Sequence, residues 1–378
     1  MRRGTIIFLL FLVTVAVIVG VSQFLQRQPA VDLEVAVSPL ALEWVSAALE
    51  RYNATNPLVN TSRLRFVAVP VEDMDVWTDG GALVRAWTDA SHPVAWLPAW
   101  SASLTYANRL PFTRVTDSLA NTVLVWGGFQ SRMNALAEGG QAFDWARVAD
   151  AAAQGTWAAI APTSGVSGNF TLAFNRPTQK IAGLAAVFSS AARFAETATL
   201  SGGSLSANDF RAWLQPVLES VPNFNTLGAS PAQTIAARGA SVGEIALLPE
   251  SDWLKNLRGQ LINTADPIQL IYPAPLFVFD FPLAAWSGAS APSFALTQTE
   301  IASAVQGLAA FLSSPAEQSA AQTFGLRPAD GRIDPTAPLF AGALPYGADL
   351  VFDSAEGIMP PTLNEVQRLL VWLNNVVP

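Results

Sequence analysis

The sequence contains no cysteine, one histidine and only two lysines, Lys180 and Lys255. The lack of cysteine excludes disulfides, cysteine-ligated zinc, iron–sulfur clusters and thiol catalysis within this chain. Charged residues are also scarce, at 13% of the 378 residues, where about 25% is usual for a soluble domain. Because 51% of the residues are hydrophobic, the composition excludes an intrinsically disordered chain, which needs low hydrophobicity and high net charge.

The charge that is present is mostly negative. The net charge is −8, and the basic residues Arg2, Arg3 and Arg27 stand at the start of the chain, where there is no acidic residue. The remainder is therefore acidic and would repel a phosphate backbone, so nucleic acid is not expected as a partner. The phosphate-binding patterns G-x-x-x-x-G-K-[ST] and G-x-G-x-x-G are both missing, and no cofactor is expected.

One stretch is long and apolar enough to span a bilayer. Thr5 to Ser22 runs for 18 residues without a charge, and as a helix it would reach about 27 Å, close to the thickness of a hydrocarbon core. No A-x-A-like cleavage site follows closely, which favours an uncleaved anchor over a cleaved signal peptide. We predict a transmembrane anchor at residues 5–24. Arg2 and Arg3 would stay inside, giving a single-pass cell-membrane protein whose body, residues 28–378, is extracytoplasmic.

The body alternates between predicted strands and predicted helices, which indicates βαβ units and a largely parallel sheet. Strands are predicted at Asp32–Val37, Leu64–Val69, Pro93–Leu97, Thr122–Trp126, Thr156–Ile160, Glu244–Leu248, Gln269–Tyr272 and Phe279–Trp286. Helices are predicted at Pro39–Tyr52 with Ser38 as its N-cap, at Ala82–Thr88, after Trp100, at Gln130–Ala137 and Asp144–Ala153, in an alanine-rich stretch ending near Ala195, at Asp209–Leu218 and Ala232–Arg238, around Trp253, and at Glu300–Leu312, Pro315–Thr323 and Leu363–Val376.

Patterns that would indicate an enzyme or a metal site fail on their context. Gly239 to Gly243 matches G-x-S-x-G, but a helix precedes it and a strand follows, the reverse of a nucleophile elbow. Asp75 and Asp79-Gly80 suggest a calcium loop, yet Trp77 and Ala86 would occupy ligand positions. His92 lacks companions at ligand spacing and is expected in a surface loop. No catalytic or metal-binding residue is predicted, and the chain is not expected to be an enzyme.

The twelve tryptophans suggest an aromatic binding surface, although most should pack in the core. Trp100 follows a predicted strand end directly, Trp126 lies where the chain leaves the first group of strands, and Trp253 follows another strand end. For each of the three, ligand contact and packing both remain open.

The order of several short segments resembles bacterial extracellular solute-binding proteins of the type 2 periplasmic-binding class. The segments that carry the resemblance are Leu33-Glu34-Val35-Ala36-Val37-Ser38-Pro39, Pro93-Val94-Ala95-Trp96-Leu97-Pro98-Ala99, Ser164 to Gly168, Gly243-Glu244-Ile245-Ala246-Leu247-Leu248-Pro249-Glu250, Ile271-Tyr272-Pro273, Phe281-Pro282-Leu283-Ala284 and Phe324-Gly325-Leu326-Arg327-Pro328-Ala329. The chain is most similar to the solute-binding module often fused to von Willebrand factor A domains, and it ends at Pro378 without such a domain.

The resemblance implies an α/β fold of two lobes, of the type 2 periplasmic-binding-protein kind, joined by two crossing strands near residues 122–127 and 278–285. The first lobe would comprise residues 31–123 and 284–378, and the second lobe residues 124–283. Ligands of open α/β sheets bind beyond the carboxyl ends of strands, where helix N-termini offer free N–H groups. The expected ligand-binding residues at such places are Ser38, Trp100, Ser101, Ser164, Gly165, Ser167 and Glu250. Ser38 and Ser164 could instead only cap helices.

Two functions remain open at this stage. The first is a membrane-anchored solute-binding protein that closes on a small molecule by hinge motion, with an ABC-type permease as its partner. A neutral or cationic solute is preferred because the body is acidic. The second is an extracytoplasmic interaction or assembly module that kept the fold without a transport role, with a von Willebrand factor A-type partner.

Overall fold

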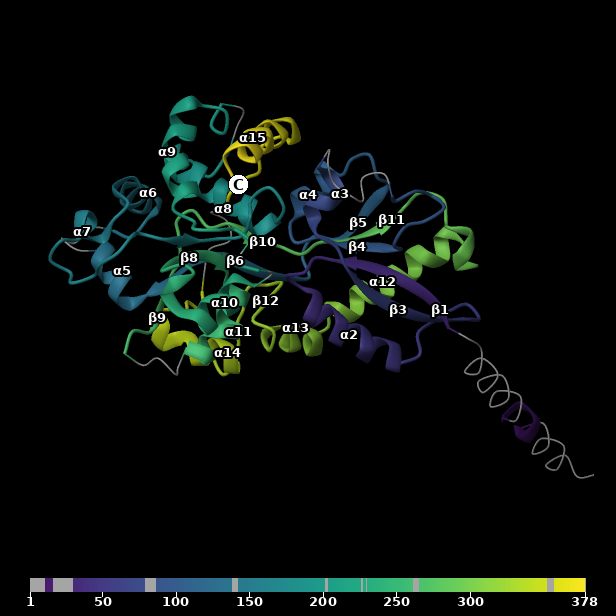
Figure 1. The fold of residues 1–378 in the computed structure, drawn as a ribbon. Coiled ribbons are helices and arrows are strands. Elements are labelled where there is room, and N and C mark those ends of the chain that lie inside the picture. The colour runs from purple at the N-terminus through teal and green to yellow at the C-terminus, as the bar shows by residue number, and fades with distance from the viewer. Residues whose placement is uncertain are drawn as a thin grey trace, which may run out of the picture.

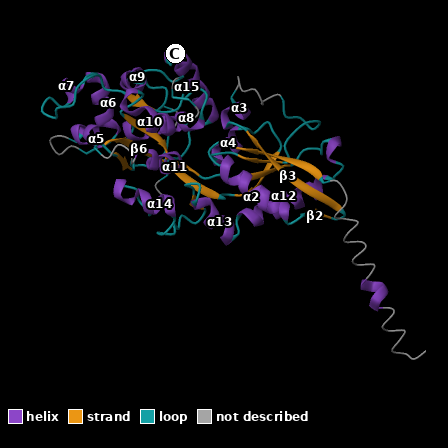
Figure 2. Cartoon of the chain, turned by 60° about the horizontal axis from the view of Figure 1, so that its bottom comes forward, coloured by secondary structure: helices purple, strands orange, loops and turns teal. Residues whose placement is uncertain are grey.

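The computed structural model describes residues 11–15, 30–78, 86–137, 142–200, 203–225, 227–228, 230–260, 265–351 and 357–377. They form two α/β lobes, each built around its own sheet (Figure 1). We call the lobe of the first sheet lobe 1 and the lobe of the second sheet lobe 2. Figure 2 shows the two sheets in orange, each with helices packed around it.

The sheet of lobe 1 has the strand order β2-β3-β1-β4-β11-β5. Its strands are β1 (Val31–Val37), β2 (Leu58–Val59), β3 (Ser62–Pro70), β4 (Ala95–Leu97), β5 (Phe112–Thr116) and β11 (Leu283–Trp286). Strand β1 pairs in parallel with both β3 and β4, whereas β11 is antiparallel to its neighbours β4 and β5. The carboxyl ends of β1, β3 and β4 therefore meet at one edge of the sheet.

The sheet of lobe 2 is built around one long strand. Its strands are β6 (Ala120–Phe129), β7 (Leu172–Ala173), β8 (Ile245–Pro249), β9 (Ile268–Ile271), β10 (Val278–Phe279) and β12 (Arg327–Pro328). Strand β6 pairs with β8, β9, β10 and β12, and β8 pairs in parallel with β7. All ten residues of β6 are buried. A strand covered on both faces reads as a continuous apolar run, which explains part of the low charge of this sequence.

Helices cover both sheets. In and beside lobe 1 they are α2 (Leu42–Ala54), α3 (Asp73–Trp77), α4 (Ser101–Tyr106), α12 (Gln298–Leu312) and α13 (Pro315–Gln322). In and beside lobe 2 they are α5 (Gln130–Leu136), α6 (Trp145–Gln154), α7 (Trp157–Ile160), α8 (Ile181–Phe194), α9 (Asn208–Glu219), α10 (Pro231–Arg238), α11 (Glu250–Gln260), α14 (Pro338–Ala343) and α15 (Leu363–Val376). The first twelve residues of α8 are all buried, so this alanine-rich helix runs through the core of lobe 2.

The chain passes between the sheets where β5 leads into β6 and where β10 leads into β11. The first passage lies at residues 117–119, slightly before the predicted 122–127, because the chain has already joined the second sheet at Ala120. The second lies at residues 280–282, within the predicted 278–285. The two passages touch, since the Leu119 N–H donates to the Phe281 carbonyl at 3.1 Å. The residues that link the lobes are thus bonded to one another.

A further passage follows α13. Helix α13 is tied to α2 of lobe 1 by an ion pair between Glu317 and Arg51 at 2.6 Å, yet β12, five residues later, pairs with β6 of lobe 2. The Gln318 side chain donates to the Leu119 carbonyl and accepts from the Ala329 N–H, both at 2.8 Å. The lobe boundaries at 123/124 and 283/284 stay a prediction, and the residues that follow α13 contribute to the second sheet.

Several local predictions were wrong. Thr156–Ile160, expected as a strand, contains helix α7. Ser38 does not cap the first helix, because a turn intervenes and α2 begins only at Leu42 with Ala41 as its N-cap. His92 is not a surface residue: it is 6% exposed, and its ring stacks on Trp286 at 4.1 Å. The predicted helix Ala82–Thr88 lies partly outside the described residues, and its described end, 86–88, is not helical.

The N-terminal prediction is mostly beyond what the structure describes. Residues 11–15 are helical, and the rest of the predicted anchor at 5–24 lies outside the described residues. Within the described part of the chain, no helix is both long and apolar enough to cross a membrane.

Candidate functional site

Three of the expected ligand-binding residues meet at the edge of lobe 1 that faces lobe 2. Ser38 follows β1, and Trp100 and Ser101 follow β4, whose last residue Leu97 is the register partner of Val37. The Ser38 N–H donates to the Leu97 carbonyl at 2.8 Å, which fixes the two strand ends together. Ser38 is fully buried, and its hydroxyl has no hydrogen-bond partner among the described residues. A buried hydroxyl without a partner is costly, by about 1–3 kcal/mol, and marks a place where a polar group could bind.

Trp100 reaches from lobe 1 into lobe 2. Its ring lies 5.0 Å from that of Phe277, which precedes β10, and 5.8 Å from that of Phe188 on α8. Only 4% of Trp100 is exposed. The next residue is held as well, since the Ser101 N–H donates to Asp280 Oδ1 at 2.7 Å. Burial raises the pKa of Asp280, while this hydrogen bond opposes the rise. An aromatic cluster therefore closes the lobes against each other.

Two ion pairs also join the lobes. Glu72, just before α3, pairs with Lys180 at 3.3 Å, and its other carboxylate oxygen accepts from the Ile181 N–H at 2.8 Å. Glu43 on α2 pairs with Lys255 on α11 at 2.8 Å. Burial raises the pKa of Glu72, and the Lys180 ammonium acts against that shift. In both pairs lobe 1 supplies the carboxylate and lobe 2 the ammonium.

A buried carboxylate supports the loop that carries Trp100. Asp73 accepts from the Ala99 N–H at 3.0 and 3.1 Å and from the Ser103 hydroxyl at 2.6 Å. Burial, followed by the charge of Glu72, raises the pKa of Asp73 to about 8. The loop between β4 and α4 is thereby fixed from the side of α3, which holds the indole of Trp100 in place.

The predicted turn with Ser164, Gly165 and Ser167 is not brought to these residues. It is exposed and lies between α7 and β7, closed by an isolated bridge between Thr156 and Asn169. Figure 1 shows α7 at the end of lobe 2 that is farther from lobe 1. The Ser164 hydroxyl donates to the Ala161 carbonyl at 2.7 Å, so it stabilises its own turn.

Glu250 is placed inside lobe 2, where no solvent reaches it. Its carboxylate forms a double contact with Arg327, at 2.6 and 2.7 Å, and both side chains are fully buried. The Tyr272 hydroxyl also donates to Glu250, and burial followed by the Glu250 charge raises the Tyr272 pKa. The guanidinium donates further to the Leu350 carbonyl at 3.3 Å. The carboxylate is thus committed to holding β12 and residues 349–350 on lobe 2.

Trp126 and Trp253 are packing residues. Each is 1% exposed, the Trp126 ring contacts that of Trp145 at 4.7 Å, and the Trp253 indole N–H donates to the Val125 carbonyl at 3.1 Å. Of the three tryptophans left open by the sequence, only Trp100 lies between the lobes.

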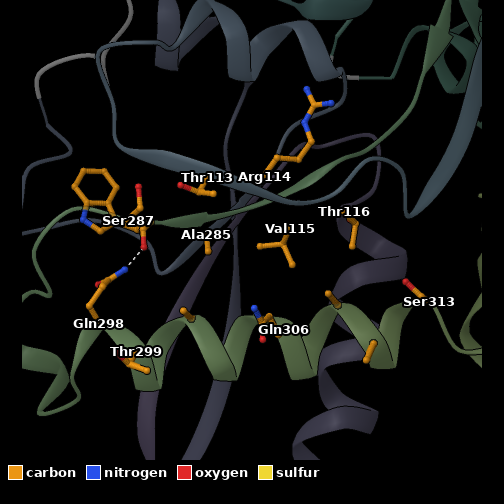
Figure 3. A pocket seen from close by; sticks show the side chains of 14 residues that line it. Thr113, Arg114, Val115, Thr116, Ala285, Ser287, Gln298, Thr299, Gln306 and Ser313 are labelled. Atoms are coloured by element: carbon orange, nitrogen blue, oxygen red, sulfur yellow. Dashed lines mark hydrogen bonds between the residues drawn. The ribbon is translucent and has the colours of Figure 1, made fainter.

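A cavity lies elsewhere, in lobe 1. It has a volume of about 760 Å³ and lies between α12 and the strands β5 and β11. In Figure 3, Val115 and Ala285 of the strands face the helix, which carries Gln306. Neither Ser38 nor Trp100 lines it, so this cavity is separate from the contact between the lobes. Within the described ranges, no three side chains of the kinds that bind metals come together.

Sequence reasoning missed most of the residues that hold the lobes together. Glu43, Glu72 and Asp280 stood out in no motif, and Phe188 lay within an alanine-rich helix. One signal was available: Lys180 and Lys255 are the only lysines of the chain, and both reach across to lobe 1.

Comparison with known proteins found similarity in structure alone. No family model and no curated protein matches the sequence. The maltose-bound MalE3 protein of T. maritima superposes with a TM-score of 0.60 at 13% identity, covering 92% of this chain and 94% of that one. AfuA of Actinobacillus pleuropneumoniae, with fructose 6-phosphate bound, gives 0.57 at 9% identity, with 92% and 98% covered. UgpB of Mycobacterium tuberculosis, in complex with glycerophosphocholine, gives 0.55 at 10% identity, with 93% and 98% covered.

These neighbours are bacterial binding proteins, and the match covers more than 90% of this chain. At such low identities the likeness concerns the fold. The resemblance inferred from the sequence is confirmed at that level: the chain has the two-lobed fold of the bacterial extracellular solute-binding proteins.

Proposed function

We propose that this chain is an extracytoplasmic solute-binding protein that captures a small ligand between its lobes and passes it to an ABC-type permease. The observation that carries the proposal is the convergence of Ser38, Trp100 and Ser101 where the lobes meet, in a fold shared with binding proteins over more than 90% of both chains. Ligands of α/β proteins bind beyond the carboxyl ends of strands, which is where these residues lie. Because Ser38 and Trp100 are buried, binding requires the lobes to separate by hinge motion.

In this proposal the N-terminal segment 5–24 anchors the body to the outer face of the membrane, close to the permease. The protein binds its ligand without changing it. The ligand contacts would come from Ser38, Trp100 and Ser101, and the predicted roles of Glu250 and of the Ser164 turn would need a different arrangement. The solutes bound by the similar proteins, maltose, fructose 6-phosphate and glycerophosphocholine, represent three chemistries worth testing.

A thermal-shift screen of the full chain tests the proposal. A bound solute should raise the melting temperature, because binding to the folded state alone stabilises it by mass action. We expect Ser38→Ala to weaken that response without lowering the stability of the free protein, since the Ser38 hydroxyl has no partner to lose. Ser164→Ala, a matched change on the exposed turn, should leave the response intact. If no sugar, amino acid, peptide or oxyanion raises the melting temperature, solute capture is contradicted.

A second function, an interaction or assembly module without a transport role, is favoured by one observation. Where the lobes meet, the rings of Trp100, Phe188 and Phe277 pack against one another. In this second proposal the packed lobes form a rigid surface for a partner, such as a von Willebrand factor A-type protein. This function would be supported over the first if no solute raises the melting temperature and a purified partner of that type binds directly.

A further inference from the structure

The chain uses its only two lysines for the same purpose. Lys180 precedes α8 and Lys255 lies on α11, both in lobe 2, and each pairs with a glutamate of lobe 1. The remaining basic side chains are arginines. Lysine carries a compact charge on a flexible stem, and it lacks the rigid fork with which arginine binds a carboxylate in two places. Such contacts suit a surface that must separate and rejoin.

The two ion pairs sit among additional carboxylates. Asp75 lies close enough to Glu72 for its charge to raise the Glu72 pKa further. Next to the second pair, burial and then Glu43 act to raise the pKa of Asp252 to about 6, against the opposing effect of Lys255. Asp73, directly beside Glu72 in the chain, is fully buried. The region around the two ion pairs therefore holds more acidic side chains than lysines.

Glu72 has a second role because it belongs to lobe 1 but bonds to the start of a helix in lobe 2. Helix α8 has 14 residues, and its N-cap residue Lys180 provides no side-chain cap. The Glu72 carboxylate supplies the missing acceptor, at 2.8 Å from the Ile181 N–H. Only 9% of the Glu72 side chain is exposed. The positive end of α8 and the Lys180 ammonium are thus already neutralised by an anion that belongs to the protein.

We propose that Glu43 and Glu72 determine the charge of the solute: they hold the two lysines when the lobes are closed, and they exclude anionic solutes while admitting uncharged or cationic ones. This inference rests on the proposed capture of a solute between the lobes. An anionic solute would have to displace Glu72 from Lys180 and from α8, and it would then face the displaced carboxylate at close range. An uncharged sugar meets neither obstacle.

The test compares phosphate binding by the full chain and by the variant Glu43→Gln/Glu72→Gln. Inorganic phosphate is the probe, titrated against sodium chloride of equal ionic strength, and the melting temperature and heat of binding are measured. The wild-type protein should show no response to phosphate beyond that to chloride. In the variant both lysines lose their partners, and we expect phosphate to bind at least about tenfold more tightly, in line with the effect of a helix terminus and a nearby charge.

A matched control removes two negative charges whose ion-pair partners are arginines and not Lys180 or Lys255. Asp32→Asn/Asp330→Asn changes the net charge equally, at the far end of β1 and in an exposed loop. It should gain no phosphate binding. Equal gain in the control, or phosphate binding by the wild-type protein, would overturn the proposal. The proposal would also be overturned if Glu43→Gln/Glu72→Gln gains no phosphate binding while circular dichroism shows that it is folded. The single variant Glu72→Gln, which retains the Glu43–Lys255 pair, serves if the double variant does not fold.

Failure of this inference is distinguishable from failure of the proposed function. If maltose or another neutral solute stabilises the wild-type protein and the variant gains no phosphate binding, the proposed solute capture is supported and the proposed charge selection is contradicted. If no solute binds the wild-type protein, solute capture falls, even where the variant gains phosphate binding.

Discussion

Replacing Glu250 by alanine separates a structural role of this residue from a ligand-binding role. The substitution leaves the Arg327 guanidinium buried without a countercharge and removes the acceptor of the Tyr272 hydroxyl. Breaking a buried ion pair by removing one partner costs about 3–5 kcal/mol of unfolding free energy. For domains of this size about 2–4 °C of melting temperature corresponds to 1 kcal/mol, so Glu250→Ala should melt at least about 6 °C below the wild-type protein.

Thermal unfolding followed by circular dichroism measures this difference. Asp32→Ala provides the control, because its ion pair with Arg65 is exposed and its loss should leave the melting temperature nearly unchanged. The double variant Glu250→Leu/Arg327→Met should recover much of the lost stability, since apolar residues of similar volume often replace a buried pair without cost. The structural role of Glu250 is refuted if Glu250→Ala has the same melting temperature as the wild-type protein. If it then also loses a solute response, the ligand role that the sequence suggested would be restored.

Three further substitutions, two of them with a control variant, test other contacts. Asp73→Asn should flatten the dependence of stability on pH. Because the folded-state pKa of Asp73 of about 8 exceeds the ordinary value of 3.8, its carboxyl group stabilises the wild-type protein at low pH, and this stabilisation is lost as the pH rises through about 8. Melting curves at several pH values check this, and parallel curves for both proteins would contradict it. Gly127→Ala should cost about 1–3 kcal/mol through overpacking, because its Cβ would lie 2.5 Å from the Trp253 ring. Gly342→Ala, whose Cβ would meet open space, should leave the unfolding free energy unchanged. Denaturant titration of both variants measures the difference. Trp100→Ala should lower the unfolding free energy by about 3–5 kcal/mol and enlarge the radius of gyration in small-angle scattering. Trp100→Phe should restore most of the unfolding free energy and most of the compactness. An unchanged radius of gyration in Trp100→Ala would mean that Trp100 does not hold the lobes together.

The fold could be predicted from the sequence further than the site could. Strand β8 is a continuous apolar run, whereas β1 and β3 alternate polar and apolar residues over part of their length. Helices such as α12 and α15 keep a helical spacing, so the positions of all these elements follow from local patterns. Short elements escaped prediction: β5 and β12 have five and two residues, and only their pairing with β11 and β6 defines them. Thr156–Ile160 is as apolar as a strand, and periodicity alone cannot separate the two in so short a run.

The residues of the candidate site also differ in how well the sequence predicts them. Ser38, Trp100 and Ser101 could be found because they directly follow strands, and parallel strands bring their carboxyl ends to one edge. Glu250 also follows a strand, but its environment depends on Arg327, 77 residues later, which no local pattern reveals. The pairing of Glu72 with Lys180 spans 108 residues and joins the two lobes. Contacts of this kind follow from the arrangement of the lobes, which the sequence does not display locally.

The position of β11 has a consequence for how this protein is made. In the sheet of lobe 1, β11 lies between β4 and β5, although it follows β5 by some 170 residues; the Leu283 N–H and Thr116 Oγ1 are 167 positions apart. At about 5–20 residues per second of synthesis, β4 and β5 wait roughly 10 to 40 seconds for the strand that joins them. During that interval both present open strand edges, which invite pairing with other chains. The sheet of lobe 1 therefore cannot be completed until β11 has been synthesised.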